Sequence, residues 1–302
     1  MMERVVEITG SKRHLSLFRG FMVIKGEEGE LGRVALDDIG VVVAAGYGIT
    51  MSNELLVALA GRGAGFVVCN HRFEPTAWLL PVSGHHQQSR RMQQQLQAGK
   101  PLKKRLWQSI IQGKIRFQAE VLAALQISHE VVASMAQNVR SGDPGNLEAQ
   151  AARRYWPLLM GKEFRRDPQS DAVNSMLDYG YTILRSCAAR AVTAAGLHPS
   201  LGIHHYGPGN PFCLADDIME PFRPVVDLAV VMLRREGREQ VDRDTKARLV
   251  GVLLQDTLGK QGTTPVATAI TRLVVSVAHS FENSQSMIEL PEKLVPNGGI
   301  FA

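Results

Sequence analysis

The sequence predicts an α+β protein in which a small N-terminal β-rich domain is followed by a larger all-helical C-terminal domain. Up to about residue 80, apolar residues occur in short runs that glycines and charged turns separate. From about residue 88 onward they recur at helical spacing. With 302 residues, 45% of them apolar, the chain can build two cores. We therefore expect domains at 1–84 and 100–302, joined by a linker at 85–99.

In the N-terminal region, each short apolar run predicts one strand. One helix is expected among them at 52–60, because Leu55 and Leu59 share a face and Gly61 or Gly63 can end it. The expected strands cover residues 4–8, 15–18, 21–24, 33–36, 39–44, 65–69 and 77–80.

In the C-terminal region, the spacing of apolar residues predicts amphipathic helices throughout. The segment before it is rich in glutamine and begins with a glycine and two histidines, which is typical of an exposed linker. The expected helices cover residues 105–136, 147–155, 172–195, 216–235, 242–258 and 265–282.

Charge is distributed unevenly along the chain, although the net charge is only +5. Between Pro75 and Ala119 there is no acidic residue, whereas arginines and lysines are frequent. Such a run can be merely a solvated surface or linker. Its uncancelled positive field would also attract a polyanion through counterion release, and DNA is the natural partner.

The cysteines predict an intracellular protein without disulfides. There are three of them, widely spaced and without a C-x-x-C pair, so neither a disulfide framework nor a zinc knuckle is indicated. The N-terminus has no long apolar core, and the apolar run at 225–233 is short and contains Asp227. We expect neither a signal peptide nor a membrane span.

The segment 202–224 concentrates imidazoles, carboxylates and an arginine around a turn rich in glycine and proline. Because the glycines and prolines at 207–211 cannot continue a helix, the chain can reverse there and bring His205 against residues 216–220. An imidazole and two carboxylates suit Mn²⁺ or Mg²⁺. From this segment alone, a structural cluster of ion pairs and helix caps is an equal alternative.

A second segment begins a helix with an acidic residue. A turn at 143–145 precedes Asn146, a plausible N-cap, and Glu148 then falls in the first turn. The carboxylate of Glu148 could simply complement the helix dipole. It could also contribute to the site that 202–224 indicates.

Four blocks in order carry a more specific pattern, at 148–156, 171–184, 196–205 and 214–224. Together they resemble the CRISPR-associated spacer integrases, the "Cas-one" family of prokaryotic adaptive immunity. The resemblance implies a β domain that forms a homodimer, a helical catalytic domain and a cytoplasmic prokaryotic protein. The block at 214–224 is most similar to the type II systems.

The resemblance also implies the site residues. The positions that bind Mg²⁺ or Mn²⁺ in the family, and thereby carry catalysis, correspond here to Glu148, His205 and Glu220. Asp217 is expected to contact a metal ligand or a bound water rather than the ion. The implied reaction is attack by a DNA 3′-hydroxyl on a phosphodiester of a CRISPR repeat.

Basic side chains near this site are expected to bind DNA phosphates, and their alternative role is ordinary surface charge. Tyr155 and Tyr181 are expected in the core rather than stacked on bases. Implied partners are DNA, a second copy of the chain, a dimer of the second CRISPR adaptation protein and the type II RNA-guided nuclease. A stand-alone structure-specific nuclease and a non-catalytic DNA-binding scaffold are the competing functions. The DNA-binding candidates are Arg223, Lys103, Lys104, Arg105, Arg153 and Arg154.

Overall fold

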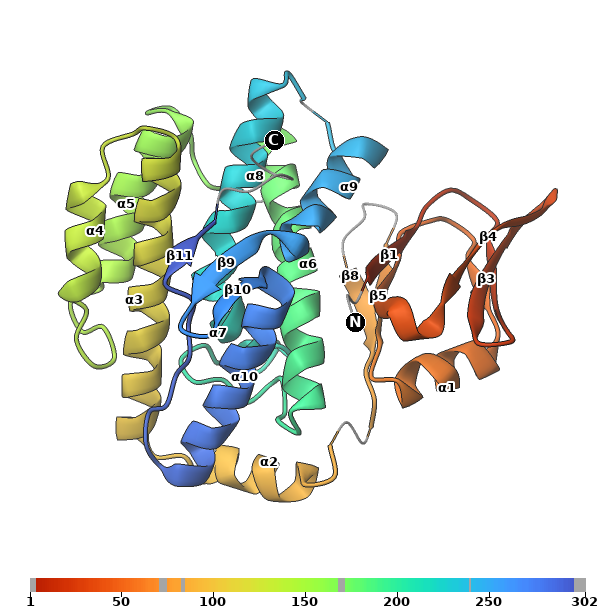
Figure 1. The fold of residues 1–302 in the computed structure, drawn as a ribbon, viewed down its shortest axis with the longest axis horizontal. Helices are drawn as coiled ribbons and strands as arrows, with labels where there is room; N and C mark the ends of the chain where they lie inside the picture. Colours follow the sequence, from red (N-terminus) through yellow and green to blue (C-terminus); the bar gives the residue numbers. More distant parts are fainter. Residues whose placement is uncertain (1–3, 71–74, 83–84, 168–171, 239, 296–302) are drawn as a thin grey trace. The chain divides into compact units, whose positions relative to one another are not determined.

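The computed structural model divides into two compact units, which span Met1–His86 and Gln87–Ala302 (Figure 1). The division falls two residues after the end of the predicted β-rich domain. The structure describes residues 4–70, 75–82, 85–167, 172–238 and 240–295.

The first unit consists of two four-stranded sheets and one helix. One sheet has the order β1-β5-β7-β8, with β8 antiparallel to its neighbour, and the other has the order β4-β3-β2-β6. Helix α1 begins at Ser52, whose hydroxyl accepts the Leu55 amide, and its leucines pack into the core with Leu15 and Phe66. The elements are β1 (Arg4–Ile8), β2 (His14–Phe18), β3 (Phe21–Gly26), β4 (Gly29–Ala35), η1 (Leu36–Asp38), β5 (Ile39–Ala44), β6 (Thr50–Met51), α1 (Asn53–Gly61), β7 (Gly65–Cys69) and β8 (Pro75–Leu79).

The second unit is mainly helical. Its longest helices, α3 and α6, enclose α7 and α8 between them (Figure 1). The elements are α2 (Gln88–Gln97), α3 (Lys100–Ala124), α4 (Glu130–Gln137), α5 (Leu147–Met160), α6 (Ala172–Ala194), α7 (Cys213–Met219), η2 (Glu220–Phe222), α8 (Arg223–Arg235), α9 (Arg243–Val250), η3 (Gly251–Leu254), β9 (Asp256–Gly259), β10 (Gly262–Pro265), α10 (Val266–Asn283) and β11 (Lys293–Leu294).

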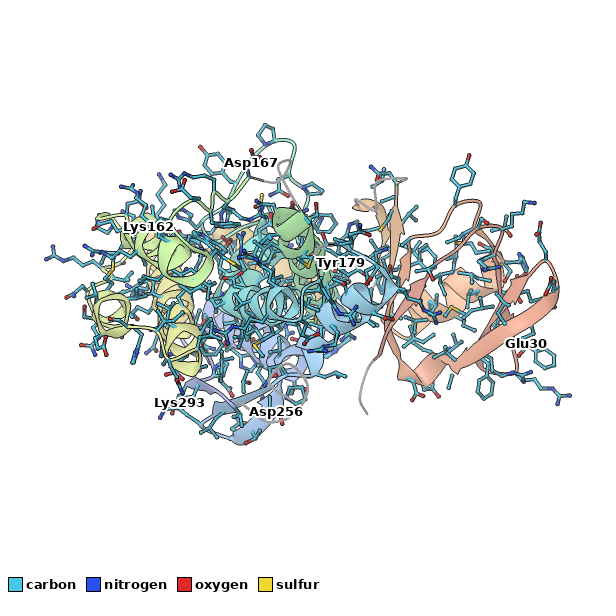
Figure 2. All side chains as sticks on the ribbon, turned by 90° about the horizontal axis from the view of Figure 1, so that it is seen from above. Glu30, Lys162, Asp167, Tyr179, Asp256 and Lys293 are labelled. Atoms are coloured by element: carbon cyan, nitrogen blue, oxygen red, sulfur yellow. The ribbon has the colours of Figure 1, made fainter. Side chains whose placement is uncertain are left out.

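The prediction of an all-helical second domain is wrong, because β10, β9 and β11 form a small antiparallel sheet there. The predicted helix at 242–258 ends at Val250. Beyond it, threonines favour extended backbone, and Gly262 has a φ of +96° at the hairpin turn. Asp256 of β9 and Lys293 of β11 mark this sheet in Figure 2.

The helices of this unit also differ from the prediction at the start of the unit and after Ala124. The expected helix at 105–136 is two helices, because Gln126 takes a φ of +59° between α3 and α4. The predicted linker contains α2, which is docked by Gln95. That side chain is fully buried, donates to the carbonyls of His198 and Leu201, and accepts the His198 amide.

No helix in the described part of the chain is long and apolar enough to cross a membrane. Cys69, Cys187 and Cys213 all fall within the described residues, and no disulfide joins them.

Close packing of α6 on α8 depends on Gly180. A Cβ atom at this position would lie 2.4 Å from Cγ1 of Val226. Both helices are extensively buried, so neither can move aside without disturbing the core.

We expect Gly180→Ala to lower the free energy of unfolding by about 1–3 kcal/mol, the usual cost of overpacking, despite the better helix propensity of alanine. Urea denaturation measures this. Gly251→Ala, which meets open space in the same unit, is the control and should be nearly neutral. A Gly180→Ala destabilisation that persists unchanged in a Val226→Ala background would contradict the steric explanation.

Candidate functional site

One face of α3 contacts all the segments that form the candidate site. Lys103, Trp107 and Lys114 are four and seven residues apart, so they share a face at 3.6 residues per turn. Lys103 Nζ donates to the carbonyl of Gly202 at 3.4 Å, Trp107 stacks on His204, and Lys114 reaches two carboxylates. Helix α3 therefore gathers the separate segments that carry the predicted site residues.

Lys114 bridges Glu148 and Glu220, which are 72 residues apart in sequence. Its Nζ lies 2.6 Å from Oε1 of Glu148 and 2.6 Å from Oε2 of Glu220. The side chains of Lys114 and Glu220 are only 12% and 4% exposed, so the pair is shielded from water. Burial opposes the charge on Lys114, but the two carboxylates outweigh it and raise the pKa of the ammonium.

Glu148 is free for this contact because other residues cap its helix. The carboxylate of Asp143 accepts the backbone amides of Leu147 and Glu148, and Asn146 accepts the amide of Ala149. With the helix start thus satisfied, the Glu148 side chain extends to Lys114 instead of its own backbone. The acidic residue still lies at the positive end of α5.

Glu220 lies in the short 3₁₀ turn η2, where Pro221 and Pro224 interrupt the predicted helix at 216–235. Its Oε1 accepts a hydrogen bond of 2.8 Å from Arg223. Burial alone would raise the pKa of the Glu220 carboxyl, but the charges of Arg223 and Lys114 lower it to about 2. Glu220 is therefore ionised throughout the neutral range.

His205 lies in the loop between α6 and α7, and Asp217 holds that loop. The Asp217 carboxylate is fully buried and accepts the amides of Ile203, His204 and His205. It also lies 2.8 Å from His205 Nδ1. This hydrogen bond, with the charges of Asp217 and Glu220, outweighs burial and raises the pKa of His205.

The Asp217 contact also fixes how the imidazole can act. A proton on Nδ1 directed at the carboxylate leaves Nε2 with the lone pair in the neutral ring. Gly202 permits the tight loop, since a Cβ there would lie 2.1 Å from the His205 carbonyl oxygen. Asp217 thus contacts His205 rather than the carboxylate pair.

Trp107 supports the same loop from α3. Its ring is stacked on His204, with centroids 4.1 Å apart and planes 5° apart, and it meets His205 edge-on at 5.5 Å. The indole is 2% exposed. His204 therefore packs on the tryptophan, while His205 is held between Trp107 and Asp217.

A buried polar network of Tyr155, Tyr181 and Asp227 lies beside Arg223. The hydroxyls of Tyr155 and Tyr181 both donate to Asp227, and the Arg223 guanidinium lies 4.2 Å from the centre of the Tyr181 ring. Burial raises the pKa of Asp227 to about 6, although these donors and Arg223 favour its charged form. The prediction that the two tyrosines belong to the core is confirmed.

The neighbouring acid Asp216 has a different role. Arg185 donates to both of its oxygens, at 2.7 and 2.9 Å, and Asn210 donates to one of them at 2.7 Å. Arg185 of α6 thereby balances the charge of Asp216 in the first turn of α7.

The arrangement is compatible with a cation between two carboxylates. Among the described residues, no group of three or more His, Cys, Asp or Glu side chains lies close enough together to hold a metal ion as the side chains stand. The position between Glu148 and Glu220 is taken by the Lys114 ammonium, which shows that a positive centre fits there. The carboxylate oxygens and the His205 Nε2 are donors of the kind that Mg²⁺ and Mn²⁺ accept.

The predicted DNA-binding residues differ in their surroundings. Lys104, Arg105, Arg153 and Arg154 are exposed on α3 and α5. Lys103 is partly buried by its contact with Gly202. Arg223 is bound to Glu220 and Tyr181, so a structural role accounts for it without DNA.

The sequence pattern alone does not assign Lys114, Trp107 or Asp227 to the site, and it indicates Lys114 only as part of the basic run. A signal is nevertheless present, since Ile110, Phe117 and Val121 surround Lys114 at helical spacing on α3. A lysine in an apolar stripe is rarely buried unless it is paired with a carboxylate.

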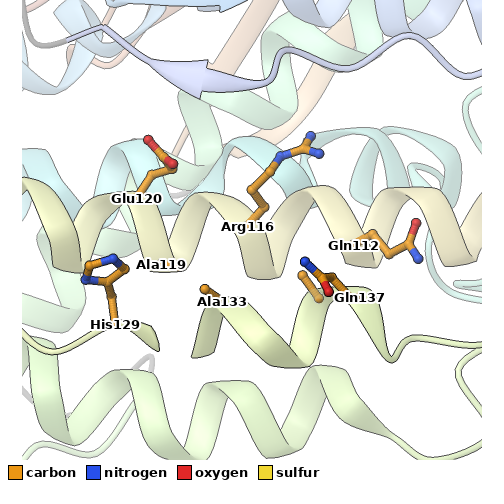
Figure 3. Close-up of a pocket in the computed structure, with 8 residues that line it drawn as sticks. Gln112, Arg116, Ala119, Glu120, His129, Ala133 and Gln137 are labelled. Carbon is orange, nitrogen blue, oxygen red and sulfur yellow. The ribbon is translucent and has the colours of Figure 1, made fainter. Parts of the chain in front are cut away.

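An open pocket of about 460 Å³ lies between α3 and α4 (Figure 3). Gln112 and Arg116 line it, and both are two residues from Lys114, which is roughly 200° around a helix. This pocket is therefore separate from the carboxylate pair.

Comparisons with known proteins agree on one family. The family model described as "CRISPR associated protein Cas1" matches residues 6–265. The chain is 37% identical over 286 residues to "CRISPR-associated endonuclease Cas1" of Neisseria meningitidis serogroup C (strain 8013), with 93% of each chain covered.

Solved structures share the fold at lower identity. A casposase bound to an integration product superposes with a TM-score of 0.80 at 18% identity, covering 95% of this chain and 92% of that one. A Cas6-RT-Cas1–Cas2 complex gives a TM-score of 0.75 at 17% identity, covering 97% of this chain and 36% of the matched chain.

We expect Asp217→Asn to lower the pKa of His205, because the hydrogen bond to Asp217 is the largest cause of its raised value. NMR titration of the imidazole C–H signals in metal-free protein measures this. Asp216→Asn removes a nearby charge but no hydrogen bond to His205, so it should lower the pKa less. Equal effects of the two variants would contradict the assignment of Asp217 as the residue that orients His205.

Proposed function

Because the chain belongs to the Cas1 family of CRISPR-associated proteins, we propose that it is a DNA endonuclease and integrase of CRISPR adaptation. It joins the 3′-hydroxyl ends of foreign DNA fragments to CRISPR repeats as new spacers. The observation that carries the proposal is the bridge of Lys114 between Glu148 and Glu220 within the matched residues, and the orientation of His205 by Asp217 supports it.

In this proposal, Glu148, His205 and Glu220 would hold a divalent ion, Mg²⁺ or Mn²⁺. When bound, such an ion polarises a phosphate and lowers the pKa of an attacking hydroxyl or water. No protein nucleophile is required, because the DNA end supplies the hydroxyl.

The protein residues prepare this site. Arg223 fixes one oxygen of Glu220 and leaves the other directed at Lys114. Asp217 fixes the ring of His205 and the tautomer that presents Nε2. Such preorganisation lowers the reorganisation needed when charge develops on the phosphate.

Exposed basic residues on α3 and α5 would bind the phosphates of the DNA. The cations Lys104 and Arg105 lie two or three residues before Trp107, and Arg153 and Arg154 follow Glu148 within two turns. Phosphate contacts of this kind set position and affinity rather than sequence preference.

We further propose that the protein works as a homodimer with the second adaptation protein, Cas2, on DNA. The fold shared with a casposase bound to an integration product, and with a chain of a Cas6-RT-Cas1–Cas2 complex, supports DNA and Cas2 as partners, whereas the homodimer rests on the family resemblance. Association with the RNA-guided nuclease of a type II system is the remaining expectation from the sequence.

We expect Glu148→Gln to reduce strand transfer of a 3′-hydroxyl donor into a CRISPR repeat by about 10²-fold or more, since removal of one charge-stabilising group commonly has this effect. This variant is preferable to Glu220→Ala, which strands Lys114 and Arg223 without their buried partner. Glu220→Ala should also abolish transfer. The assay includes Mn²⁺ and Cas2 and compares 3′-hydroxyl with 3′-deoxy donors.

Glu163→Gln, which changes an exposed glutamate beyond the end of α5, is the control and should remain active. A 3′-deoxy donor that is still joined would refute attack by the DNA end. Cleavage without joining would favour the stand-alone nuclease. Full activity of Glu148→Gln would remove this residue from the site and favour a DNA-binding scaffold.

We expect Lys104→Ala/Arg105→Ala to weaken DNA binding and to reduce the log–log salt slope by about 0.9 for each phosphate that these two side chains neutralise. Lys260→Ala/Lys293→Ala removes the same charge from exposed positions near the small sheet and is the matched control. Fluorescence anisotropy at several salt concentrations measures both. Identical slopes for the two double variants would mean that this part of α3 is only solvated surface.

A further inference from the structure

We infer that Lys114 is an internal counter-ion that holds the metal-free site together and that a divalent ion must displace it to bind. The inference rests on the proposed function, since it concerns the same two carboxylates. It adds a residue and a regulatory step: metal binding exchanges one positive centre for another.

The geometry of Lys114 carries the inference. Its Nζ is 2.6 Å from a carboxylate oxygen of both Glu148 and Glu220. A divalent ion held by Glu148 and Glu220 would need the carboxylate oxygens that the ammonium now occupies. The ammonium would therefore have to leave these oxygens when an ion binds.

Burial explains why the metal-free protein needs such a counter-ion. Glu220 is 4% exposed, and Arg223 engages only its Oε1. Without Lys114, Oε2 would face Glu148 with no compensating charge, which is costly in a shielded environment. Lys114 thus stabilises two carboxylates that have to stay close together for metal binding.

The location of Lys114 makes the exchange possible. It projects from the middle of α3, a 25-residue helix, so the backbone that carries it is rigid. Its four-carbon stem is flexible, and the ammonium has one compact charge that can move as a unit. The carboxylates can remain in place while the lysine side chain changes its rotamer.

Displacement has a thermodynamic consequence. The work of removing Lys114 from its two partners is subtracted from the intrinsic affinity of the site for the ion, as in any linked equilibrium. Removing the lysine should therefore destabilise the metal-free protein and increase metal affinity. If the lysine merely supported the fold, its removal would not increase the metal affinity.

The test measures Mn²⁺ binding to EDTA-stripped protein through the EPR signal of the Mn²⁺ that remains free. Lys114→Met should bind Mn²⁺ at least 10-fold more tightly than the unmodified chain. Without metal, the melting temperature of Lys114→Met should be lower than that of the unmodified chain. Adding Mn²⁺ should raise the melting temperature of this variant by more than it raises that of the unmodified chain. Lys100→Met, which removes an exposed lysine at the start of α3, should behave like the unmodified chain. Lys114→Arg keeps the charge and should not gain affinity.

Unchanged or weaker Mn²⁺ binding by Lys114→Met would overturn the inference. If Glu148→Gln still loses Mn²⁺ binding in that case, the proposed metal site stands without it. If Glu148→Gln and Glu220→Gln bind Mn²⁺ as the unmodified chain does, no ion enters between these carboxylates, and the proposed metal site fails together with the inference.

A measurement on the unmodified chain covers the case in which Lys114→Met does not fold. Reductive methylation of lysines, read by peptide mass spectrometry, should label Lys114 slowly in stripped protein because its side chain is 12% exposed and doubly paired. Saturating Mg²⁺ should accelerate the labelling of Lys114 several-fold and leave exposed Lys100 unchanged. Equal labelling of Lys114 with and without Mg²⁺ would overturn the inference.

Discussion

The buried charge of Glu220 is the constraint around which the helical unit is arranged. A carboxylate that is 4% exposed has to be balanced, and two cations from different helices balance it. Lys114 brings α3, and through Glu148 also α5, to this point. Arg223 brings the start of α8 and, through Tyr181 and Asp227, connects to the packing of α6. Ionic pairing at one residue thus links four helices.

Much of the candidate site could be predicted from the sequence because the informative residues occur in local blocks. Glu148 follows a recognisable cap, and His205 and Glu220 flank a turn that glycines and prolines impose. Lys114 and Trp107 carry no such local signature. Their roles depend on which helix face meets which loop, and contacts between segments so distant in sequence are decided by tertiary packing.

The predicted elements were most accurate where a strong local signal ends them. The helix expected at 52–60, with Gly61 or Gly63 as its end, corresponds to α1, and the short apolar runs correctly placed most strands of the first unit. Periodicity alone could not show that Gln126 breaks a long helix through a positive φ. Nor could it show that the chain after Val250 pairs as a hairpin, since helical spacing and a threonine-rich strand overlap in that stretch.

The stacking of Trp107 on the histidine loop gives the protein an optical reporter of its own. Protonated imidazoles quench indole emission on contact, and the Trp107 ring touches both His204 and His205. The indole of Trp156 lies instead against the rings of Tyr155 and Phe164. A change in the protonation of His205 is therefore expected to alter the emission of Trp107, one of the three tryptophans of the chain, in unlabelled protein.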